Sequence, residues 1–413
     1  MTRKLLTGNG AAAWGARLAR CDYVPAFPIT PQTEIIENLA LWIDRGEMEA
    51  RLVTMDSEHS MITAAGAAAS SGVRVFTATS SQGLLYAMEM LYNVAGWRAP
   101  FVMINVSRGL SAPITLESDH NDIMAARDTG FLQIHCATCQ EVLDSVLMAY
   151  RLAEHKEVRV PAVVNLDGFY LSFTREPVTL IDENQAASFV GEFDAENLQF
   201  RASSPLSQAV AVLGGGPYSY FRYETHLAVL RALSVYKDVA NEFEKIFGRR
   251  YDIIEEYRME DAEYVFVMLG SFATKAKDAV EALRTAGLQV GLARLRLFRP
   301  FPRQQLRALL KGRRGAAVID QNISMGMGGI VYSELAGALY GLKGAPVLAS
   351  FIGGLGGRDI RQEEFFEMIS IVKTCADKGE SPMPRLLYTR NELAEMRKLQ
   401  AIAQLERHKL HQK

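Results

Sequence analysis

The feature that most constrains the fold is a series of three short apolar runs in the first quarter of the chain, each ending in a polar turn. The runs begin at Leu52, Val73 and Pro100, and segments that are rich in alanine and glycine, or amphipathic, separate them. This alternation predicts a parallel, doubly wound sheet with helices on both faces, which is an α/β fold. In such a sheet, ligands bind beyond the carboxyl ends of the strands.

Polar residues follow all three runs, at the edge where a ligand is expected. They are Glu58, the stretch Thr79–Gln82 that includes Ser81, and Ser107 with Arg108. Each has a structural explanation, because an acid suits a helix start, hydroxyls cap helices and a lone arginine commonly forms an ion pair. A guanidinium also matches a carboxylate with two hydrogen bonds, so Arg108 is a candidate for binding an acidic substrate.

Two earlier stretches resemble ligand-binding turns. Thr30 followed by Pro31 predicts a helix start with the hydroxyl at the N-cap, and the helix is expected to run through Trp42. Capping and ligand contact both remain open for the Thr30 hydroxyl. The glycines from Gly8 to Gly15 look like a phosphate loop, but no convincing strand precedes them, so close helix packing is the favoured interpretation.

Composition excludes several classes of protein. A net charge of -2 with 22% charged residues argues against nucleic-acid binding, and no apolar run is long enough to span a membrane. The amino terminus lacks the apolar core of a signal peptide. Four cysteines in 413 residues indicate thiols in a reducing compartment, so a cytoplasmic location is expected.

Two clusters resemble metal sites in residue type. Cys136 and Cys139 form an isolated C-x-x-C pair, which is interpreted as structural because the other cysteines are distant in sequence. Asp119, His120 and Asp122 lack further clustered ligands, so no metal site is predicted there.

The later part of the chain predicts a second α/β unit. Buried strands are expected near residues 264–270, 288–297, 316–320 and 346–351, with glycine-rich turns after the last two. The predicted boundaries are residues 1–177 for the first domain, 178–258 for a connector with a long helix, 259–385 for the second domain and 386–413 for a helical tail.

With these motifs in order, the chain resembles the alpha subunit of the 2-oxoacid:acceptor oxidoreductases, the pyruvate:ferredoxin oxidoreductase family. The matching motifs are Phe27–Pro31, Asp56–Ser60, Thr77–Leu84, Asp119–Ile123, Val318–Ser324 and Gly353–Arg358. They are spread over most of the chain. The resemblance implies a thiamine-diphosphate pyrimidine-binding domain followed by a transketolase C-terminal-like domain.

The resemblance also implies partners and cofactors. Thiamine diphosphate would be shared with a beta subunit that carries the diphosphate half-site, and Mg²⁺ and [4Fe-4S] clusters would lie in partner subunits. Further partners would be gamma- or delta-type subunits and iron–sulfur subunits. Coenzyme A would be the co-substrate, and ferredoxin or NAD would accept the electrons. The reaction implied is oxidative decarboxylation of a 2-oxo acid to acyl-CoA and carbon dioxide.

Motif positions then assign roles to individual residues. Glu58 matches the carboxylate that converts the aminopyrimidine to its reactive imino form, Thr30 the substrate-contacting threonine and Arg108 the substrate-carboxylate arginine. Ser81 and Gln82 are expected to contact the cofactor together with Glu58. In such enzymes the cofactor carries out the bond-making and bond-breaking steps, and the protein orients the cofactor and substrate and polarises their reacting groups.

The sequence departs from pyruvate-type members at two places. Glu117–Ser118 stands where a glycine is common, and Phe173 lies where a histidine is common. The substrate is therefore open between pyruvate and bulkier 2-oxo acids, including aromatic ones such as phenylglyoxylate. Two alternatives are a regulatory subunit that kept the fold and a subunit of another split thiamine enzyme.

Overall fold

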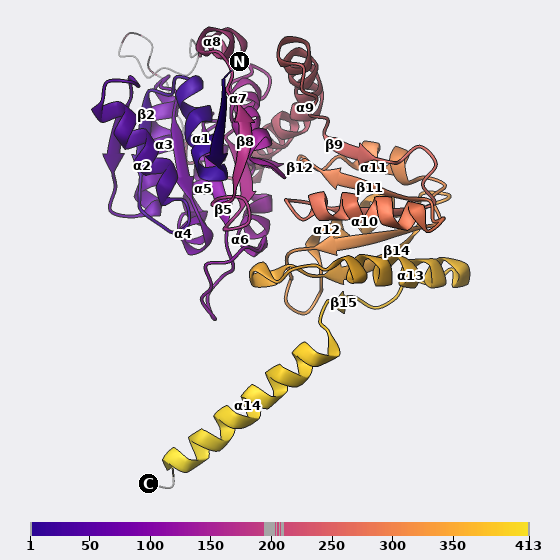
Figure 1. Cartoon of the computed structure of the whole chain (residues 1–413). Coiled ribbons are helices and arrows are strands. Elements are labelled where there is room, and N and C mark those ends of the chain that lie inside the picture. Colours follow the sequence, from indigo (N-terminus) through magenta and orange to yellow (C-terminus); the bar gives the residue numbers. More distant parts are fainter. Residues whose placement is uncertain (1, 194–202, 204, 206, 208–209, 412–413) are drawn as a thin grey trace.

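The computed structural model describes residues 2–193, 203, 205, 207 and 210–411, and its two main sheets are each covered by helices (Figure 1). The strands at the first sheet are β2 (Tyr23–Ala26), β3 (Arg51–Thr54), β4 (Phe76–Thr79), β5 (Val102–Ser107), β6 (Leu132–His135), β7 (Ala162–Asp167) and β12 (Leu297–Arg299). Their order is β12-β6-β7-β5-β4, and the β2-β3 pair continues the sheet beyond β4 through a bridge between Tyr23 and Val75. All neighbours except β12 are parallel. The predicted α/β fold is confirmed, although β2 lies between β3 and β4.

Helices cover both faces of this sheet because alternate side chains on its strands point to opposite sides. The helices are α1 (Gly8–Leu18), α2 (Thr33–Asp44), α3 (Glu58–Ser70), α4 (Ser81–Tyr86), α5 (Met88–Gly96), α6 (Asn121–Ala125), α7 (Cys139–Ala153) and α8 (Glu183–Val190), with a short 3-10 turn, η1 (Ala126–Asp128). Val102, Ile104 and Val106 of β5 face a core shared with α1 and α7. Phe101 and Met103 face a second core under α3 and α5.

The amino-terminal glycines follow a strand that the sequence did not reveal. β1 (Arg3–Thr7) pairs antiparallel with β8 (Arg175–Thr179), and it is mostly exposed, so it lacks the apolar pattern of a buried strand. The prediction that no convincing strand precedes these glycines was therefore wrong. The interpretation of these glycines as sites of close helix packing agrees with the structure at Gly15, because a Cβ atom there would overlap Val146 of α7.

The second sheet has the order β15-β14-β13-β10-β11-β9, and its core strands are parallel while β9 is antiparallel. Its strands are β9 (Ile254–Tyr257), β10 (Tyr264–Met268), β11 (Val290–Leu295), β13 (Gly315–Asp320), β14 (Val347–Ile352) and β15 (Arg385–Leu386). The helices α10 (Ala273–Thr285) and α13 (Gln362–Lys378) cover one face, and α11 (Arg303–Leu310) and α12 (Ile330–Leu339) cover the other. A 3-10 turn, η2 (Leu355–Gly357), follows β14.

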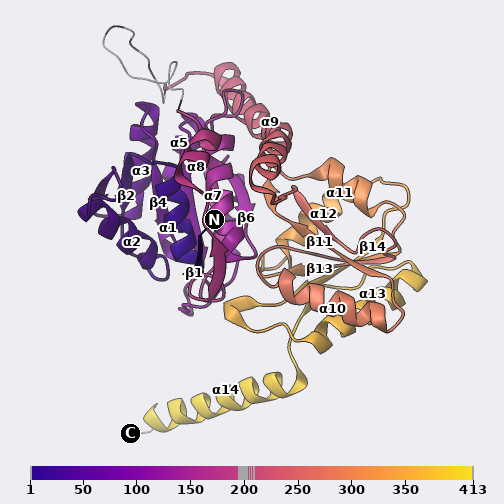
Figure 2. The same cartoon turned by 45° about the horizontal axis from the view of Figure 1, so that its top comes forward.

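Three elements extend beyond a single unit. The predicted strand from Leu288 to Leu297 divides, because β11 stays in the second sheet whereas β12 joins the first. The long helix α9 (Gly215–Phe247) packs on α5 and α7 and leads from the first unit to the second (Figure 2). The tail forms α14 (Arg390–His411), which projects away from the body in both views. Part of the predicted connector, at residues 194–202, 204, 206 and 208–209, lies outside the described residues.

None of the helices in the described part of the chain is both long and apolar enough to cross a membrane.

Candidate functional site

Glu58 is the first residue of α3, directly beyond the carboxyl end of β3. Ser57 caps the helix, since its side chain accepts a hydrogen bond from the Ser60 amide at 3.1 Å. This leaves the Glu58 side chain free to turn inwards, where it is only 5% exposed. Burial raises the pKa of Glu58 above that of an ordinary glutamate, because desolvation disfavours the charged form.

The Glu58 carboxylate lies against Gly83, in the first helical turn after β4. A Cβ atom at Gly83 would overlap Glu58 Oε1 and the Thr79 hydroxyl, so only glycine leaves room for both groups. Among the described residues, the Thr79 hydroxyl is buried without a hydrogen-bond partner. The Glu58 carboxylate accepts a hydrogen bond from its own backbone amide, which lowers its pKa by less than burial raises it. A carboxylate of raised pKa in such a setting is suited to sharing a proton with a bound group.

Arg108 extends its guanidinium across the same edge from the end of β5. Its Nη1 donates to the Thr30 carbonyl oxygen at 2.6 Å, and its Nη2 donates to Gln82 Oε1 at 3.0 Å. The structure thus brings Arg108, Thr30 and Gln82 into contact, although they follow three different strands. The residue is 6% exposed, and its Nε has no hydrogen-bond partner among the described residues.

Thr30 does not cap a helix, contrary to the sequence prediction. α2 begins at Thr33 with Gln32 at the N-cap, and no side chain caps it. The Thr30 carbonyl is instead committed to Arg108, and Thr30 is exposed. Across the described residues, no partner takes up its hydroxyl, so contact between this group and a ligand stays a prediction.

Ser81 and Gln82 are the first two residues of α4, which begins directly after β4 and the N-cap residue Ser80. Ser81 adopts a left-handed backbone with φ of +47°, which is uncommon for a residue with a side chain and is often found at functional sites. Its hydroxyl lies 2.6 Å from Gln82 Oε1 and 3.0 Å from the Gly109 carbonyl oxygen. These contacts hold the Gln82 amide against Arg108, while no residue in the described part of the chain bonds to the buried Gln82 Nε2.

A buried polar network that the sequence analysis missed supports this turn. Asp122 Oδ2 accepts hydrogen bonds from the Ser81 amide at 2.9 Å and the Asn105 side chain at 3.1 Å, and Oδ1 accepts one from the Ser107 hydroxyl at 2.8 Å. Asn105 also donates to Asn165, which stands opposite it on β7. The signal was available in the two asparagines, because both lie in otherwise apolar strands where a polar side chain needs a buried partner.

The residues that resembled metal ligands have other partners. Asp119 accepts hydrogen bonds from the backbone and side chain of Asn121, and His120 pairs with Asp167. No group of three or more potential metal ligands occurs among the residues that the structure describes. Cys136 and Cys139 are both buried, and burial raises their thiol pKa values, so the pair has the character of structural thiols.

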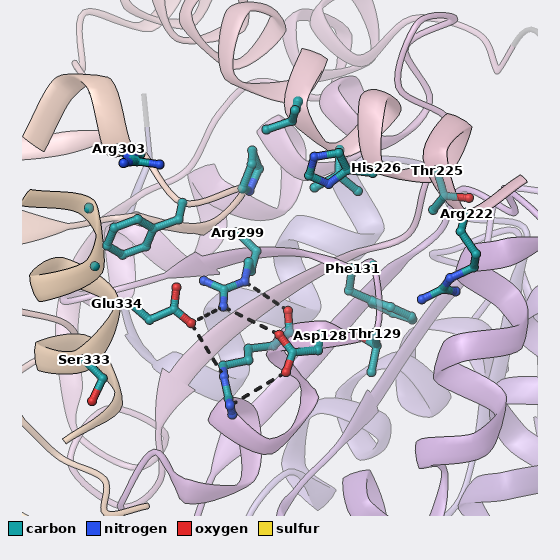
Figure 3. Close-up of a pocket in the computed structure, with 18 residues that line it drawn as sticks. Asp128, Thr129, Phe131, Arg222, Thr225, His226, Arg299, Arg303, Ser333 and Glu334 are labelled. Carbon is teal, nitrogen blue, oxygen red and sulfur yellow. Dashed lines mark hydrogen bonds and ion pairs between the residues drawn. The ribbon is translucent and has the colours of Figure 1, made fainter. Parts of the chain in front are cut away.

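A large hollow lies elsewhere, between α9, α12 and the turn that precedes β6 (Figure 3). Its volume is about 760 Å³, and Arg299 on its wall forms ion pairs with Glu334 and Asp128. None of Glu58, Ser81, Gln82, Arg108 or Thr30 lines it. The convergent polar edge, rather than this hollow, is therefore the candidate active site.

The polar edge suits a thiamine cofactor, whose aminopyrimidine ring both donates and accepts hydrogen bonds. Glu58 offers a carboxylate of raised pKa, and Thr79 Oγ1, Gln82 Nε2 and Arg108 Nε are buried polar atoms that lack partners within the described chain. Buried polar atoms are nearly always hydrogen-bonded in native proteins, so this set fits a bound group that offers complementary donors and acceptors.

Two family models match the chain. Residues 14–245 match "Pyruvate flavodoxin/ferredoxin oxidoreductase, thiamine diP-binding", and residues 262–365 match "Pyruvate:ferredoxin oxidoreductase core domain II". The pyruvate synthase subunit PorA of Pyrococcus abyssi is 40% identical over 92% of this chain and 96% of its own length. The ketoisovalerate oxidoreductase subunit VorA of the same organism is also 40% identical, over 92% of this chain and 95% of its own length.

Solved structures share the fold at low sequence identity. A 2-oxoglutarate:ferredoxin oxidoreductase from Magnetococcus marinus aligns with a TM-score of 0.69 and 17% identity. The alignment covers 90% of this chain and 65% of that longer chain. A split-gene transketolase aligns with a TM-score of 0.50 and 11% identity, over 88% of this chain and 97% of its own.

Proposed function

The chain belongs to the pyruvate:ferredoxin oxidoreductase family as an alpha subunit, and from this premise we propose that it supplies the pyrimidine-binding half of a thiamine diphosphate site. The observation that carries the proposal is the Glu58 carboxylate, which is buried, raised in pKa and set against Gly83 beside the unpartnered Thr79 hydroxyl. The complete enzyme would oxidise a 2-oxo acid in the presence of coenzyme A to acyl-CoA and carbon dioxide.

Glu58 is proposed to act on the aminopyrimidine of the cofactor. When bound, thiamine diphosphate supplies a nucleophilic ring carbon and a sink for the electrons of decarboxylation. Glu58 would hold the pyrimidine nitrogen and share a proton with it. Its raised pKa favours this role, because a shared proton is held most evenly when the two groups have similar pKa values.

Arg108 and Thr30 are proposed to bind the substrate. Arg108 already uses Nη1 and Nη2 for the Thr30 carbonyl and the Gln82 side chain, which orients the guanidinium plane. A 2-oxo acid carboxylate that approaches this plane would form a charge-assisted pair in a largely dehydrated setting. Thr30 is exposed and its carbonyl oxygen accepts from Arg108, so its hydroxyl is proposed to meet the substrate oxygen beside the guanidinium.

The remaining groups of the site are assigned to partner subunits. A beta subunit would bring the diphosphate half-site with Mg²⁺ and cover the unpartnered atoms of Gln82 and Arg108. Iron–sulfur clusters in further subunits would take the electrons, with ferredoxin or NAD as the final acceptor. This arrangement is supported by the relatives, whose names describe them as subunits.

The substrate is proposed to be a 2-oxo acid of the pyruvate class, with branched or aromatic acids as the alternative. Relatives named for pyruvate and for ketoisovalerate are equally similar to the chain, at 40% identity each. Phe173 is 43% exposed and packs on Phe169, so an aromatic surface stands where pyruvate-type members tend to carry a histidine. This departure is the reason for testing bulkier acids such as phenylglyoxylate as the alternative.

The central test is the substitution Glu58→Gln in the assembled complex. The amide keeps the shape but cannot share a proton, so viologen reduction by the 2-oxo acid with coenzyme A should fall about 10²- to 10⁴-fold, the usual range for a general acid or base. The control is Glu157→Gln, at an exposed glutamate remote from this edge. Full activity in the Glu58→Gln complex would refute the role.

A panel of acids tests the substrate. The wild-type complex would be offered pyruvate, 2-oxoglutarate, a branched-chain acid, phenylglyoxylate and indolepyruvate in separate assays. One strong response would fix the substrate. No response, with thiamine bound and clusters intact, would favour the regulatory-subunit alternative.

A further inference from the structure

His120 forms a buried ion pair at the junction of the two units. Its Nε2 lies 2.5 Å from Oδ1 of Asp167, and both side chains are 1% exposed. Burial alone would lower the pKa of His120, but the adjacent Asp167 raises it above the ordinary value. Both groups of the pair are removed from water, and the Asp167 carboxylate favours the protonated form of the imidazole.

The second unit holds this pair from the other side. Asp167 Oδ2 accepts hydrogen bonds from the Ser271 amide at 2.7 Å and the Ser271 hydroxyl at 2.5 Å, just beyond the end of β10. The His120 amide donates to the Gln321 carbonyl at 2.7 Å, beyond the end of β13. Gly270 permits this approach, because a Cβ atom there would come within 2.8 Å of the His120 ring.

The next two residues continue the contact towards the active site. Asn121 Oδ1 accepts a hydrogen bond from the Ile323 amide at 2.9 Å, which is a second tie to the loop after β13. Asp122 then turns into the first unit and accepts the Ser81 amide at 2.9 Å and the Arg108 amide at 3.3 Å on the same Oδ2 atom. We refer to His120–Asp122 as the strap.

The strap is short, so its two ends move together. Consecutive Cα atoms are about 3.8 Å apart and the peptide units are rigid, so a shift of His120 is passed to Asp122. Asp122 holds the backbone of Arg108 and of Ser81, and the Ser81 hydroxyl holds Gln82. The backbone of Arg108 and the Gln82 side chain are thus linked through the strap to contacts that the second unit makes.

We propose that His120 is a positioning residue for the reaction: its ion pair with Asp167, held by Ser271 of the second unit, fixes the strap and so keeps Arg108 and Gln82 aligned for the substrate carboxylate. This inference rests on the proposed function of Arg108. It assigns to the second unit a direct part in substrate binding, through a path of hydrogen bonds that ends at Arg108.

The test compares His120→Gln, Asp167→Asn and Ser271→Ala with wild type in the assembled complex. The steady-state assay separates KM for the 2-oxo acid, KM for coenzyme A and kcat. We expect KM for the 2-oxo acid to rise about tenfold or more in the first two variants, because small misplacements of a binding group weaken binding strongly. KM for coenzyme A should be unchanged. Ser271→Ala should show a smaller effect, because the Ser271 amide still reaches Asp167.

A second measurement, amide hydrogen exchange, reports on the hydrogen bonds that link the strap to Ser81 and Arg108. The Ser81 and Arg108 amides are both held by Asp122, so their hydrogen exchange should become faster in His120→Gln, without an equal change in the remote helix α13. The matched control is His155→Gln, at a partly exposed histidine just beyond α7. This control should leave both kinetic constants and exchange as in wild type.

The possible outcomes separate a failure of the positioning role of His120 from a failure of the proposed function. Loss of thermal stability with KM for the 2-oxo acid unchanged would show a purely structural pair and overturn the inference. If His120→Gln fails to assemble, the milder Ser271→Ala decides, because an unchanged KM and unchanged exchange in that variant would also overturn it. A wild-type complex that oxidises no 2-oxo acid would instead refute the proposed function.

Discussion

The carboxylate of Glu58 lies so close to Gly83 that a Cβ atom at position 83 would overlap Glu58 Oε1. The two residues belong to different strand-to-helix turns, after β3 and after β4. A buried carboxylate is thereby seated against a helix that lacks a side chain at that point. The Glu58 side chain can point in this direction only because residue 83 has no Cβ atom.

Gly83→Ala should therefore inactivate the enzyme while leaving the fold intact. The added methyl group would push the Glu58 carboxylate aside, and a misplacement of about 1 Å can lower a rate about 10²-fold. The measurement is viologen reduction by the assembled complex. Gly96→Ala is the matched control, because nothing lies within 4 Å of a Cβ atom there. Equal activity in the two variants would contradict the close contact.

Arg108→Lys should weaken substrate binding more than it slows turnover. A lysine ammonium has no fork, so it cannot keep the Thr30 carbonyl and Gln82 Oε1 while also facing a carboxylate. Loss of about 1.5–3 kcal/mol for a charged hydrogen bond corresponds to KM higher by about 10- to 100-fold. Arg250→Lys, at an exposed ion pair, is the control. An unchanged KM for the 2-oxo acid would remove Arg108 from the substrate site.

Glu141→Gln should destabilise the junction between the two units. Glu141 of α7 pairs with Arg294 of β11 at 2.8 Å and with Arg296, and all three side chains are nearly inaccessible. Removing one charge from a buried pair typically costs up to about 3–5 kcal/mol when the other charge is left without a partner. The loss here should be smaller than that limit, because Glu255 still pairs with Arg294 and Arg296. Thermal or urea unfolding at pH 7 would measure the loss. Glu281→Gln, which breaks an exposed pair with Arg258, should change stability by less than about 1 kcal/mol.

The ion pairs of Glu141 with Arg294 and Arg296 also predict that the free energy of unfolding falls in acid. Burial would raise the pKa of Glu141, but Arg294 and Arg296 lower it to about 2. A carboxyl with a lowered folded-state pKa stabilises the fold above its unfolded value, near 4.5, and this contribution is lost as the pH falls towards 2. The stability difference between wild type and Glu141→Gln should thus shrink between about pH 5 and pH 2. A constant difference across this range would contradict the ion-pair assignment.

The His120–Asp167 pair predicts the opposite pH dependence, because its contribution to stability is lost as the pH rises. The pKa of His120 is raised in the folded state, so its stabilising contribution is complete below the unfolded value, about 6.5, and is lost as the pH rises through the folded value. The ionisable groups near the imidazole are Asp167, Asp119, Asp122, Asp320 and His135. Burial lowers the pKa of His135, which therefore stays neutral over this range. The melting temperature of wild type should fall more than that of His120→Gln as the pH is raised above neutral.

Local sequence patterns predicted much of the architecture. The apolar runs and their polar ends located β3, β4 and β5, the small residues after Glu58 located α3, and the strand pattern of the second unit located its central sheet. They failed where no buried apolar pattern exists, as in the exposed strand β1, and where a tertiary contact redirected a residue. Thr30 had the features of an N-cap, yet its carbonyl binds Arg108 and the helix starts later.

The sequence by itself determined which residues stand at strand ends, because hydrophobic periodicity and helix-start residues are local properties of the chain. It therefore placed Glu58, Ser81, Gln82 and Arg108 at one predicted edge. The tertiary structure decided which of these side chains meet, since strand order and helix packing join segments that are far apart in sequence. Gly83 against Glu58, and Asp122 beneath Ser81 and Arg108, are contacts of this kind. A hydrogen bond depends on positions within a fraction of an ångström, and only the packed fold sets them.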